Sequence, residues 1–337
     1  MRDLIEKYAN EYKFSDIHIK EGTPISLRIH GDMTRPSEDI ITKQMLRDFA
    51  DNVLTDDQKK HLEEIRDVDL AIETQSYRFR VNFFYTSVGL SAVLRKIETQ
   101  IPSMEALNLP DIIRDISKKP NGLILVTGPT GSGKSTSLAA LVNEINATRK
   151  GHILTVEDPI EYIHHPQECT VSQREVGRDA HSFASALRAA LREDPNVILV
   201  GEMRDRETIQ LALTAAETGH LVFGTLHTSG APNTINRIID VFPAEQQGQV
   251  RSQIAESLQM VVTQRLFKTA DGNGRAAAFE IMLCNHAVRN LIRQGKTFQI
   301  ESTMQTSRGE GMITMETAIE ALIESGKVTQ EGVDNAH

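Results

Sequence analysis

Gly128-Pro-Thr-Gly-Ser-Gly133-Lys134-Ser135-Thr136 matches the phosphate-binding pattern G-x-x-x-x-G-K-[ST]. The apolar, β-branched run at residues 123–127 precedes it and predicts a buried strand of a parallel sheet. Residues 135–145 follow it with the apolar spacing of a helix. Glycines between a strand and a helix let backbone N–H groups surround an anion, and the helix N-terminus adds the positive end of its dipole. We therefore predict that the chain binds a nucleoside triphosphate.

The side chains of this loop and of the first helical turn supply the remaining phosphate contacts. Lys134 is long enough to reach the β- and γ-phosphates, and the hydroxyl of Ser135 is a ligand for Mg²⁺. A glycine turn without a ligand is the alternative, and a chance match at four fixed positions is rare. The residues predicted to bind the nucleotide are Thr130, Gly131, Ser132, Gly133, Lys134, Ser135 and Thr136.

Apolar strands alternate with helical segments through the second half of the chain. Short apolar runs occupy residues 153–156, 197–200 and 221–225, and helical patterns lie around residues 180–192 and 206–217. Such alternation is typical of a mostly parallel sheet with helices on both faces. Residues 121–337 are therefore expected to form an α/β domain.

The N-terminal part of the chain has a different texture. Five strand-like runs surround one helical stretch, which predicts a smaller α+β domain on an antiparallel sheet at residues 1–98. The strands are expected at residues 16–20, 25–30, 68–73, 77–84 and 90–96, and the helix from about residue 42 to 64. Residues 99–120 contain three prolines and predict an interdomain linker with one short helix near residues 109–117.

Composition and charge exclude several classes of protein. A net charge of −9 argues against a surface that coats nucleic acid. No apolar run approaches 18 residues, so no direct membrane insertion is expected, and the first residues lack the apolar core of a signal peptide. Cys169 and Cys284 are far apart, which suits a reduced compartment and excludes a cysteine-based zinc module. We expect a cytoplasmic protein whose membrane association comes through a protein partner.

Acidic residues follow two of the predicted strands. Glu202 follows the run at 197–200, and Glu157 follows the run at 153–156. Gly201, just before Glu202, stands where many ATPases with a phosphate loop carry aspartate. Tips of parallel strands meet at one edge of a sheet, where these carboxylates can hold Mg²⁺ through water or activate the attacking water. The alternatives are a solvated strand end for Glu202 and a helix N-cap for Asp158.

Two histidines bracket the predicted strand at 221–225. His227 or His220 can sense the γ-phosphate through a hydrogen bond, and a purely structural role is the alternative for each. A metal site is not expected at His164, His165 and Cys169, because their spacing matches no familiar site.

Three arginines lie on neighbouring predicted strands of the N-terminal domain. Alternation places Arg78 and Arg80 on one face of their strand, and Arg95 follows on the next. Two interpretations remain open for them: a solvated sheet face, or arginine fingers that neutralise charge on the triphosphate.

Taken together, these motifs resemble the secretion-type hexameric ATPases of pili and secretion systems, and most closely the PilT-like type IV pilus retraction ATPases. The resemblance covers nearly the whole chain and is specific because the motifs come in the family's order and spacing. Residues 287–293, Ala-Val-Arg-Asn-Leu-Ile-Arg, look like a signature of the retraction branch. The other matching stretches are residues 15–19, 78–82, 128–136, 157–161, 190–195, 201–205 and 219–228.

The resemblance implies a PAS-like N-terminal domain joined by a flexible linker to a RecA-like P-loop domain that hydrolyses ATP with Mg²⁺. Glu157 would match the catalytic glutamate and Glu202 the Walker B glutamate. Arg80 and Arg95 would match arginines that reach the γ-phosphate, and His227 belongs to the histidine box. Six subunits would form a ring that works on an inner-membrane platform protein and drives pilus retraction and twitching motility.

Some features depart from the family pattern, and other functions remain open. Arg206 stands where relatives usually carry leucine, and Val288 replaces an isoleucine of the signature. A pilus-assembly or type II/IV secretion ATPase is the main alternative, although the four-cysteine module usual in pilus-extension enzymes is missing. A DNA translocase would favour a basic groove, and a non-hydrolysing regulator would not need intact Lys134 and Glu202.

Overall fold

The computed structural model describes residues 1–29, 32–97, 100–272 and 274–335. The chain divides into two compact units, Met1–Gln100 and Ile101–His337. Residue 30 of the second predicted strand and residues 98–99 at the predicted domain boundary lie outside the described residues.

The first unit contains one antiparallel sheet with the strand order β3-β2-β1-β6-β5-β4. Its central strands β1, β6 and β5 carry the alternating sequences from which strands were predicted, whereas the short edge strand β3 was not predicted. The strands are β1 (Asp16–Lys20), β2 (Ser26–Ile29), β3 (Asp32–Thr34), β4 (Asp67–Glu73), β5 (Arg78–Thr86) and β6 (Gly89–Ile97).

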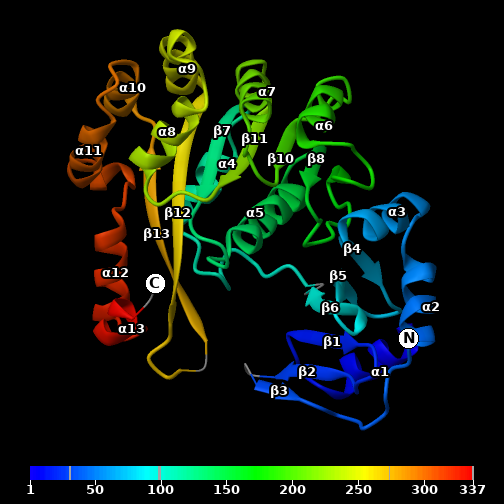
Figure 1. The fold of residues 1–337 in the computed structure, drawn as a ribbon. Helices are drawn as coiled ribbons and strands as arrows, with labels where there is room; N and C mark the ends of the chain where they lie inside the picture. Colours follow the sequence, from blue (N-terminus) through cyan, green and yellow to red (C-terminus); the bar gives the residue numbers. More distant parts are fainter. Residues whose placement is uncertain (30–31, 98–99, 273, 336–337) are drawn as a thin grey trace. The chain divides into compact units, whose positions relative to one another are not determined.

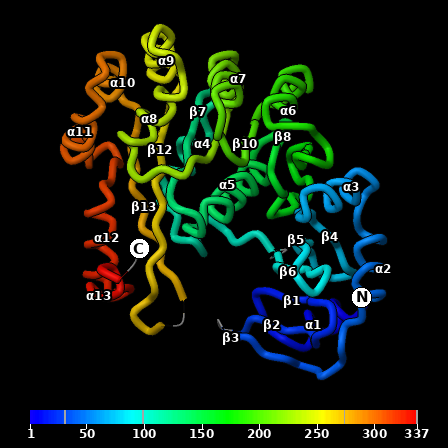
Figure 2. The backbone as a smooth tube through the Cα atoms, in the orientation of Figure 1, coloured from blue at the N-terminus to red at the C-terminus, as the bar shows by residue number. Residues whose placement is uncertain are grey.

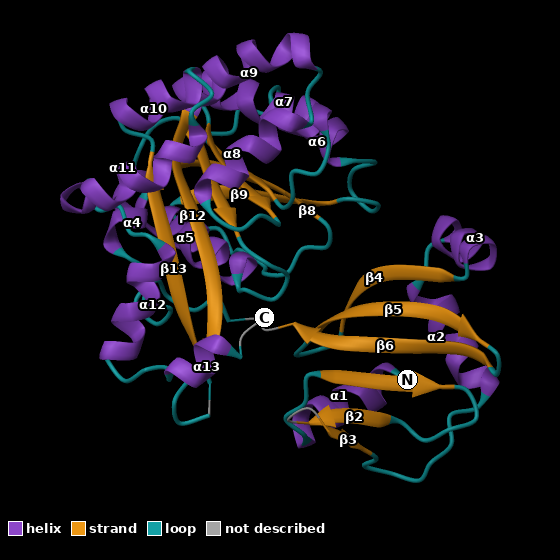
Figure 3. Cartoon of the chain, turned by 60° about the vertical axis from the view of Figure 1, so that its left-hand side comes forward, coloured by secondary structure: helices purple, strands orange, loops and turns teal. Residues whose placement is uncertain are grey.

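Three helices contribute side chains to the core of this unit, and Figure 3 shows α1 and α2 behind the strands and α3 near the end of β4. They are α1 (Arg2–Glu11), α2 (Lys43–Val53) and α3 (Asp56–Ile65). The single helix expected at 42–64 is two helices, because Thr55 forms a capping box with Gln58 and starts α3 anew. Helix α1 was not predicted; it contributes Ile5 and Tyr8 to the core of the unit.

The two faces of this sheet differ in character. Ile17, Phe79 and Leu94 point into the core and are fully buried. The alternate residues of the same strands, among them Arg80 and Arg95, lie on the opposite face. The first unit therefore presents a polar sheet face that carries the predicted arginines.

The second unit is built on a seven-stranded mixed sheet with the order β13-β12-β7-β11-β10-β8-β9. All neighbouring pairs are parallel except β12 with the edge strand β13. The strands are β7 (Gly122–Thr127), β8 (Gly151–Glu157), β9 (Cys169–Glu175), β10 (Val197–Val200), β11 (Leu221–Leu226), β12 (Leu258–Lys268) and β13 (Arg275–Leu283). The α/β class is confirmed, and β9, β12 and β13 are strands that were not predicted.

Helices cover both faces of this sheet (Figure 1). On β7, Leu123 and Leu125 belong to the core beneath α7, α8 and α9, whereas Ile124 and Val126 belong to the core beneath α5. This alternation follows from the pleat of a strand buried on both sides. The helices are α5 (Lys134–Thr148), α6 (Phe183–Ala190), α7 (Arg206–Glu217), α8 (Ala231–Asp240) and α9 (Ala244–Ser257).

The C-terminal part of the second unit adds a long ribbon and a set of short helices. Figure 2 traces the β12–β13 ribbon, with α12 and α13 beside it. Phe267 and Ala278 of the ribbon pack with Val328 and with apolar side chains of α12. These last elements are α10 (His286–Arg293), η1 (Thr297–Gln299), α11 (Ile300–Thr306), η2 (Arg308–Glu310), α12 (Met315–Glu324) and α13 (Gln330–Asp334).

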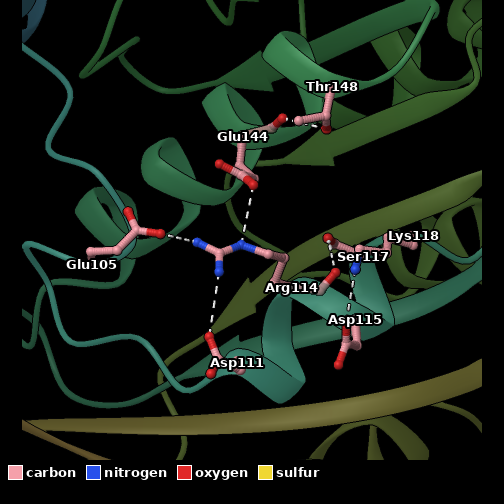
Figure 4. Close-up of polar contacts among 8 residues, drawn as sticks. All are labelled: Glu105, Asp111, Arg114, Asp115, Ser117, Lys118, Glu144 and Thr148. Carbon is pink, nitrogen blue, oxygen red and sulfur yellow. Dashed lines mark hydrogen bonds and ion pairs between the residues drawn. The ribbon is translucent and has the colours of Figure 1, made fainter.

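Residues 101–120, where we expected a linker, pack onto the second unit. Met104, Leu109 and Ile113 lie in the same core as α5. The short helix occurs as α4 (Asp111–Ser117). Figure 4 shows Arg114 of α4 bound to three carboxylates, those of Glu105, Asp111 and Glu144, the last on α5 with an Nε–Oε1 distance of 3.1 Å. This stretch is therefore fastened to the helix that follows the phosphate loop.

Candidate functional site

The phosphate loop lies between the end of β7 and the start of α5, as the sequence predicts. Gly128 has a φ of 137°, and a Cβ there would lie 2.3 Å from the carbonyl oxygen of Gln264. Gly133, with a φ of 87°, precedes the first residue of α5, and a Cβ on it would lie 2.8 Å from the side chain of Gln264. Only glycine fits both positions, because the loop is pressed against β12.

Gln264 is a supporting residue that the sequence did not indicate. Its side chain is 3% exposed and accepts a hydrogen bond of 2.8 Å from the hydroxyl of Ser137 on α5. It thus joins β12 to the helix that follows the phosphate loop. The β12 strand itself was not predicted, so this contact was not predicted either.

Lys134 is buried and turned back toward its own loop. Its Nζ donates to the carbonyl oxygens of Gly128 at 2.9 Å and Pro129 at 3.0 Å. Burial lowers the pKa of Lys134, and the nearby carboxylates of Glu202 and Glu161 oppose that shift. A phosphate group at the loop offers this ammonium a stronger partner than two carbonyl oxygens.

The other hydroxyls of the loop differ in their surroundings. Ser132 Oγ is buried and has no hydrogen-bond partner among the described residues, so it is available to a ligand. Thr136 Oγ1 lies 3.0 Å from the hydroxyl of Tyr162, and Ser135 is exposed at the start of α5. The two glycines and these hydroxyls fit a bound phosphate chain.

Glu202 follows β10 and forms a bidentate ion pair with Arg204. The guanidinium binds both carboxylate oxygens, with Nε–Oε1 at 2.6 Å and Nη2–Oε2 at 2.7 Å. Partial burial alone would raise the pKa of Glu202, but Arg204 and His227 hold it below its usual value. This carboxylate is therefore ionised near neutral pH.

His227 connects Glu202 to the phosphate loop. Its Nε2 lies 3.3 Å from Glu202 Oε1, and its Nδ1 lies 3.4 Å from the hydroxyl of Thr130. The structure therefore brings together three predicted site residues from β10, β11 and the loop. The Nδ1 of His220 lies 2.9 Å from the carbonyl oxygen of Ala215 near the end of α7.

Glu157 ends β8, the strand beside β10. A Cβ on Gly201 would lie 3.1 Å from the carbonyl oxygen of Val156 and 3.2 Å from Glu157 Cα, so glycine permits the close approach of the two strand tips. Burial raises the pKa of the Glu157 carboxyl, which still accepts hydrogen bonds from Thr155 at 2.7 Å and Gln173 at 3.3 Å. A carboxylate with a raised pKa is suited to accept a proton.

The helix N-cap considered for Asp158 is wrong. Residues 158–168 form no helix, and the next described element is the strand β9. Asp158 is exposed, and the chain instead folds back through Ile160, whose N–H donates to Glu175 at 3.1 Å. Arg206 is also exposed, at the first position of α7, where Asp205 caps the helix by accepting from Thr208 N–H at 2.9 Å.

The predicted arginines occupy the polar sheet face of the first unit. Arg80 and Arg95 stand directly opposite each other on β5 and β6. Arg95 binds Asp16 with an Nε–Oδ1 distance of 2.8 Å, and Arg80 lies 3.7 Å from Asp69. Arg78 shares this face but is buried, so the expected solvation does not extend to it.

Within the residues that the structure describes, no group of three or more His, Cys, Asp or Glu side chains is arranged to hold a metal ion. Mg²⁺ in nucleotide sites takes one or two protein oxygens together with phosphate oxygens, so the Ser135 hydroxyl and the Glu202 carboxylate fit such a role. Across the described residues, no helix combines the length and apolar character that a membrane span requires.

Comparison with known families gives a match along almost the entire chain. The profile of the family described as "Type II/IV secretion system protein" matches residues 3–322. The chain belongs to this family. Its α/β fold is that of the secretion ATPases.

Individual members of the family are similar over most of their length. A "Twitching motility protein" from Neisseria gonorrhoeae is 51% identical over 92% of this chain and 83% of its own. The type IV pilus retraction ATPase PilT of Pseudomonas aeruginosa is 48% identical, and the match covers 94% of this chain and 92% of PilT. A solved structure of "the Pilus Retraction Motor PilT and Bound ADP" has a TM-score of 0.92 and 44% identity, and covers 100% of this chain and 96% of that one.

Two further proteins are similar to this chain at lower identity, one by its solved structure and one by its sequence. The ATPase DotB of Legionella pneumophila has a TM-score of 0.88 and 30% identity, with 99% of this chain and 95% of that chain covered. The type II secretion system protein HxcR of Pseudomonas aeruginosa is 33% identical over 82% of this chain and 62% of its own.

Proposed function

We propose that this chain is the ATP-hydrolysing motor of type IV pilus retraction, the process behind twitching motility. This proposal rests mainly on the phosphate loop and on Glu157, Glu202 and His227, which lie together at the neighbouring strand ends. Two relatives about half identical over more than nine-tenths of this chain bear names for twitching motility and pilus retraction. The enzyme is an ATP hydrolase that uses Mg²⁺.

In this mechanism the phosphate loop binds ATP through backbone N–H groups and the side chains of residues 130–136. Lys134 exchanges the carbonyl oxygens of its own loop for the β- and γ-phosphates. Ser135 directly, and Glu202 partly through water, would hold Mg²⁺, which supplies positive charge to the phosphates. Ser132 Oγ donates to the phosphate chain, which satisfies its buried hydroxyl.

Glu157 is the general base of the proposed reaction. An O–H bond of the attacking water breaks, its proton passes to the Glu157 carboxylate, and the water oxygen bonds to the γ-phosphorus as the bond to ADP breaks. His227 reports the state of the γ-phosphate, because it connects Thr130 of the loop to Glu202. Arg80 and Arg95 neutralise charge that develops on the transferred group.

At the level of assembly, we propose a PAS-like first domain, a RecA-like second domain and a ring of six copies. The ring acts in the cytoplasm, peripheral at the inner membrane, on a platform protein of the pilus machinery. Because residues 101–120 are fastened to α5, a displacement of α5 on hydrolysis reaches the start of the second unit directly. Nucleic acid is not a partner of this motor.

A pilus-assembly or type II/IV secretion ATPase is the second candidate, favoured by the matching family profile and by the sequence similarity to the type II secretion system protein HxcR. Deleting the gene and counting surface pili separates the two. Retraction predicts excess pili and lost surface motility, whereas bald cells would indicate assembly and unchanged piliation would indicate secretion. Purified Glu202→Gln protein should bind ATP and fail to hydrolyse it; full turnover would contradict the assignment of the site.

A further inference from the structure

The carboxylate of Glu157 is held by two side chains outside the recognised motif. Thr155 Oγ1 donates a hydrogen bond of 2.7 Å to Glu157 Oε1. Gln173 Nε2 donates to the same oxygen at 3.3 Å. Thr155 precedes Glu157 by two residues on β8, so the pleat places both side chains on one face of the sheet. Oε1 is thus bound from its own strand and from the neighbouring strand β9.

Gln173 is itself fixed by the backbone of the segment between β8 and β9. Its Oε1 accepts from His164 N–H at 2.8 Å, and its Nε2 also donates to the carbonyl oxygen of Tyr162 at 2.9 Å. An amide with both ends engaged cannot rotate freely, so the N–H that meets Glu157 has a defined direction. The hydroxyl of Tyr162 in turn lies 3.0 Å from the hydroxyl of Thr136 in the phosphate loop. The same segment therefore contacts the proposed base and the nucleotide loop.

We propose that Thr155 and Gln173 are positioning residues that orient Glu157 for proton abstraction and favour its ionised form. This inference rests on the proposed role of Glu157 as the base. Thr155 is fully buried, and its hydroxyl donates to the partly buried carboxylate of Glu157. A hydrogen bond to a charged acceptor is strong under such conditions. Misplacement of a catalytic group by about 1 Å costs about 100-fold in rate, so small rotations of Glu157 matter.

The proposal also predicts a direction for the pH dependence. Burial raises the pKa of Glu157, and the two donors oppose that shift because they bind the ionised form. Among the charged neighbours, Glu161 after β8 also raises the pKa of Glu157, Glu175 stands opposite Glu157 on β9, and Arg204 after β10 is paired with Glu202. Removing a donor therefore raises the pKa of Glu157 further. The acidic limb of the kcat profile then moves to higher pH.

The test compares Thr155→Val with Thr155→Ser in the full-length protein, by steady-state ATP hydrolysis across pH. Valine matches the shape of threonine in a buried strand and removes the hydroxyl. We expect kcat to fall about 10-fold or more, KM for ATP to stay within about twofold, and the acidic limb to move upward. Serine restores a hydroxyl and should recover most of the loss. Thr170→Val, an exposed threonine on β9, is the matched control and should leave kcat unchanged.

Gln173→Met provides an independent second variant, since it keeps the length of the side chain without its amide. The same fall in kcat and the same upward shift of the acidic limb support the proposal. Wild-type kcat and pH profile in both Thr155→Val and Gln173→Met would overturn it. Glu157→Gln separates this outcome from failure of the proposed function. An inactive Glu157→Gln with normal Thr155 and Gln173 variants refutes only the positioning role, whereas an active Glu157→Gln refutes the role of the base.

Discussion

Replacing Gly128 by alanine should disrupt the phosphate loop far more than the same change at Gly131. A Cβ at Gly128 would lie 2.3 Å from the backbone oxygen of Gln264, whose strand β12 is paired with β7 and β13. The strand cannot retreat, so the loop must shift, at about 1–3 kcal/mol for overpacking. The φ of 137° adds about 1–3 kcal/mol of backbone strain. The expected total is roughly 2–6 kcal/mol.

Gly131 is the matched control, because its φ of 78° is also positive but nothing lies within 4 Å of its Cβ position. Only left-handed strain remains there, at about 1–2 kcal/mol. In a unit of this size 1 kcal/mol lowers the melting temperature by about 2–4 °C. Calorimetry without nucleotide should therefore show a drop of roughly 4–24 °C for Gly128→Ala and roughly 2–8 °C for Gly131→Ala.

Calorimetry without nucleotide measures only the stability of the folded protein, so its result does not depend on how well either variant binds ATP. We also expect Gly128→Ala to lose ATP affinity in equilibrium binding, since its displaced backbone no longer surrounds the phosphates. The reasoning would be refuted if the two variants melted within about 2 °C of each other, because the contact with Gln264 would then carry no energetic weight.

Three further predictions concern stability and the arginines. Burial, with His165 beside it, lowers the pKa of His164 to about 4, below its unfolded value of about 6.5, so the unfolded chain binds the proton first as pH falls. Urea unfolding should thus show about 2 kcal/mol more loss between pH 7 and 5 in the wild type than in His164→Gln, and equal losses would contradict this assignment. Phe223→Ala, in the fully buried core of β11, should cost about 3–5 kcal/mol by the same method, and a cost below about 1 kcal/mol would mean that the cavity closes. Arg95→Ala should destabilise the first unit by roughly 1–3 kcal/mol because it removes the partner of the buried Asp16 carboxylate, whereas Arg80→Ala should leave stability unchanged. Both arginine variants should lower kcat for ATP, and normal kcat in Arg80→Ala would remove that residue from the proposed mechanism.

Local patterns predicted much of the second unit, because its strands are short, apolar and buried on both faces. The boundaries of α7 and the strand–loop–helix around residues 128–136 follow from apolar spacing and glycine placement. The β12–β13 ribbon was missed because it is an antiparallel pair that carries polar residues such as Gln264 among its apolar ones. The strand β9 was missed because only Cys169 and Val171 of its seven residues are apolar.

Some residues of the candidate site were indicated by the sequence, and others were found only in the tertiary structure. The sequence by itself indicated the phosphate loop, Glu157, Glu202 and His227, because each follows a strand whose end must lie at one edge of the sheet, and it indicated His220 just before β11. It left the histidine roles open, and only the tertiary structure assigned His227 to Glu202 and His220 to the end of α7. The partners Gln173, Gln264 and Arg114 could come only from the fold. Each meets its target through packing between segments distant in the sequence, and local spacing carries no information about such contacts.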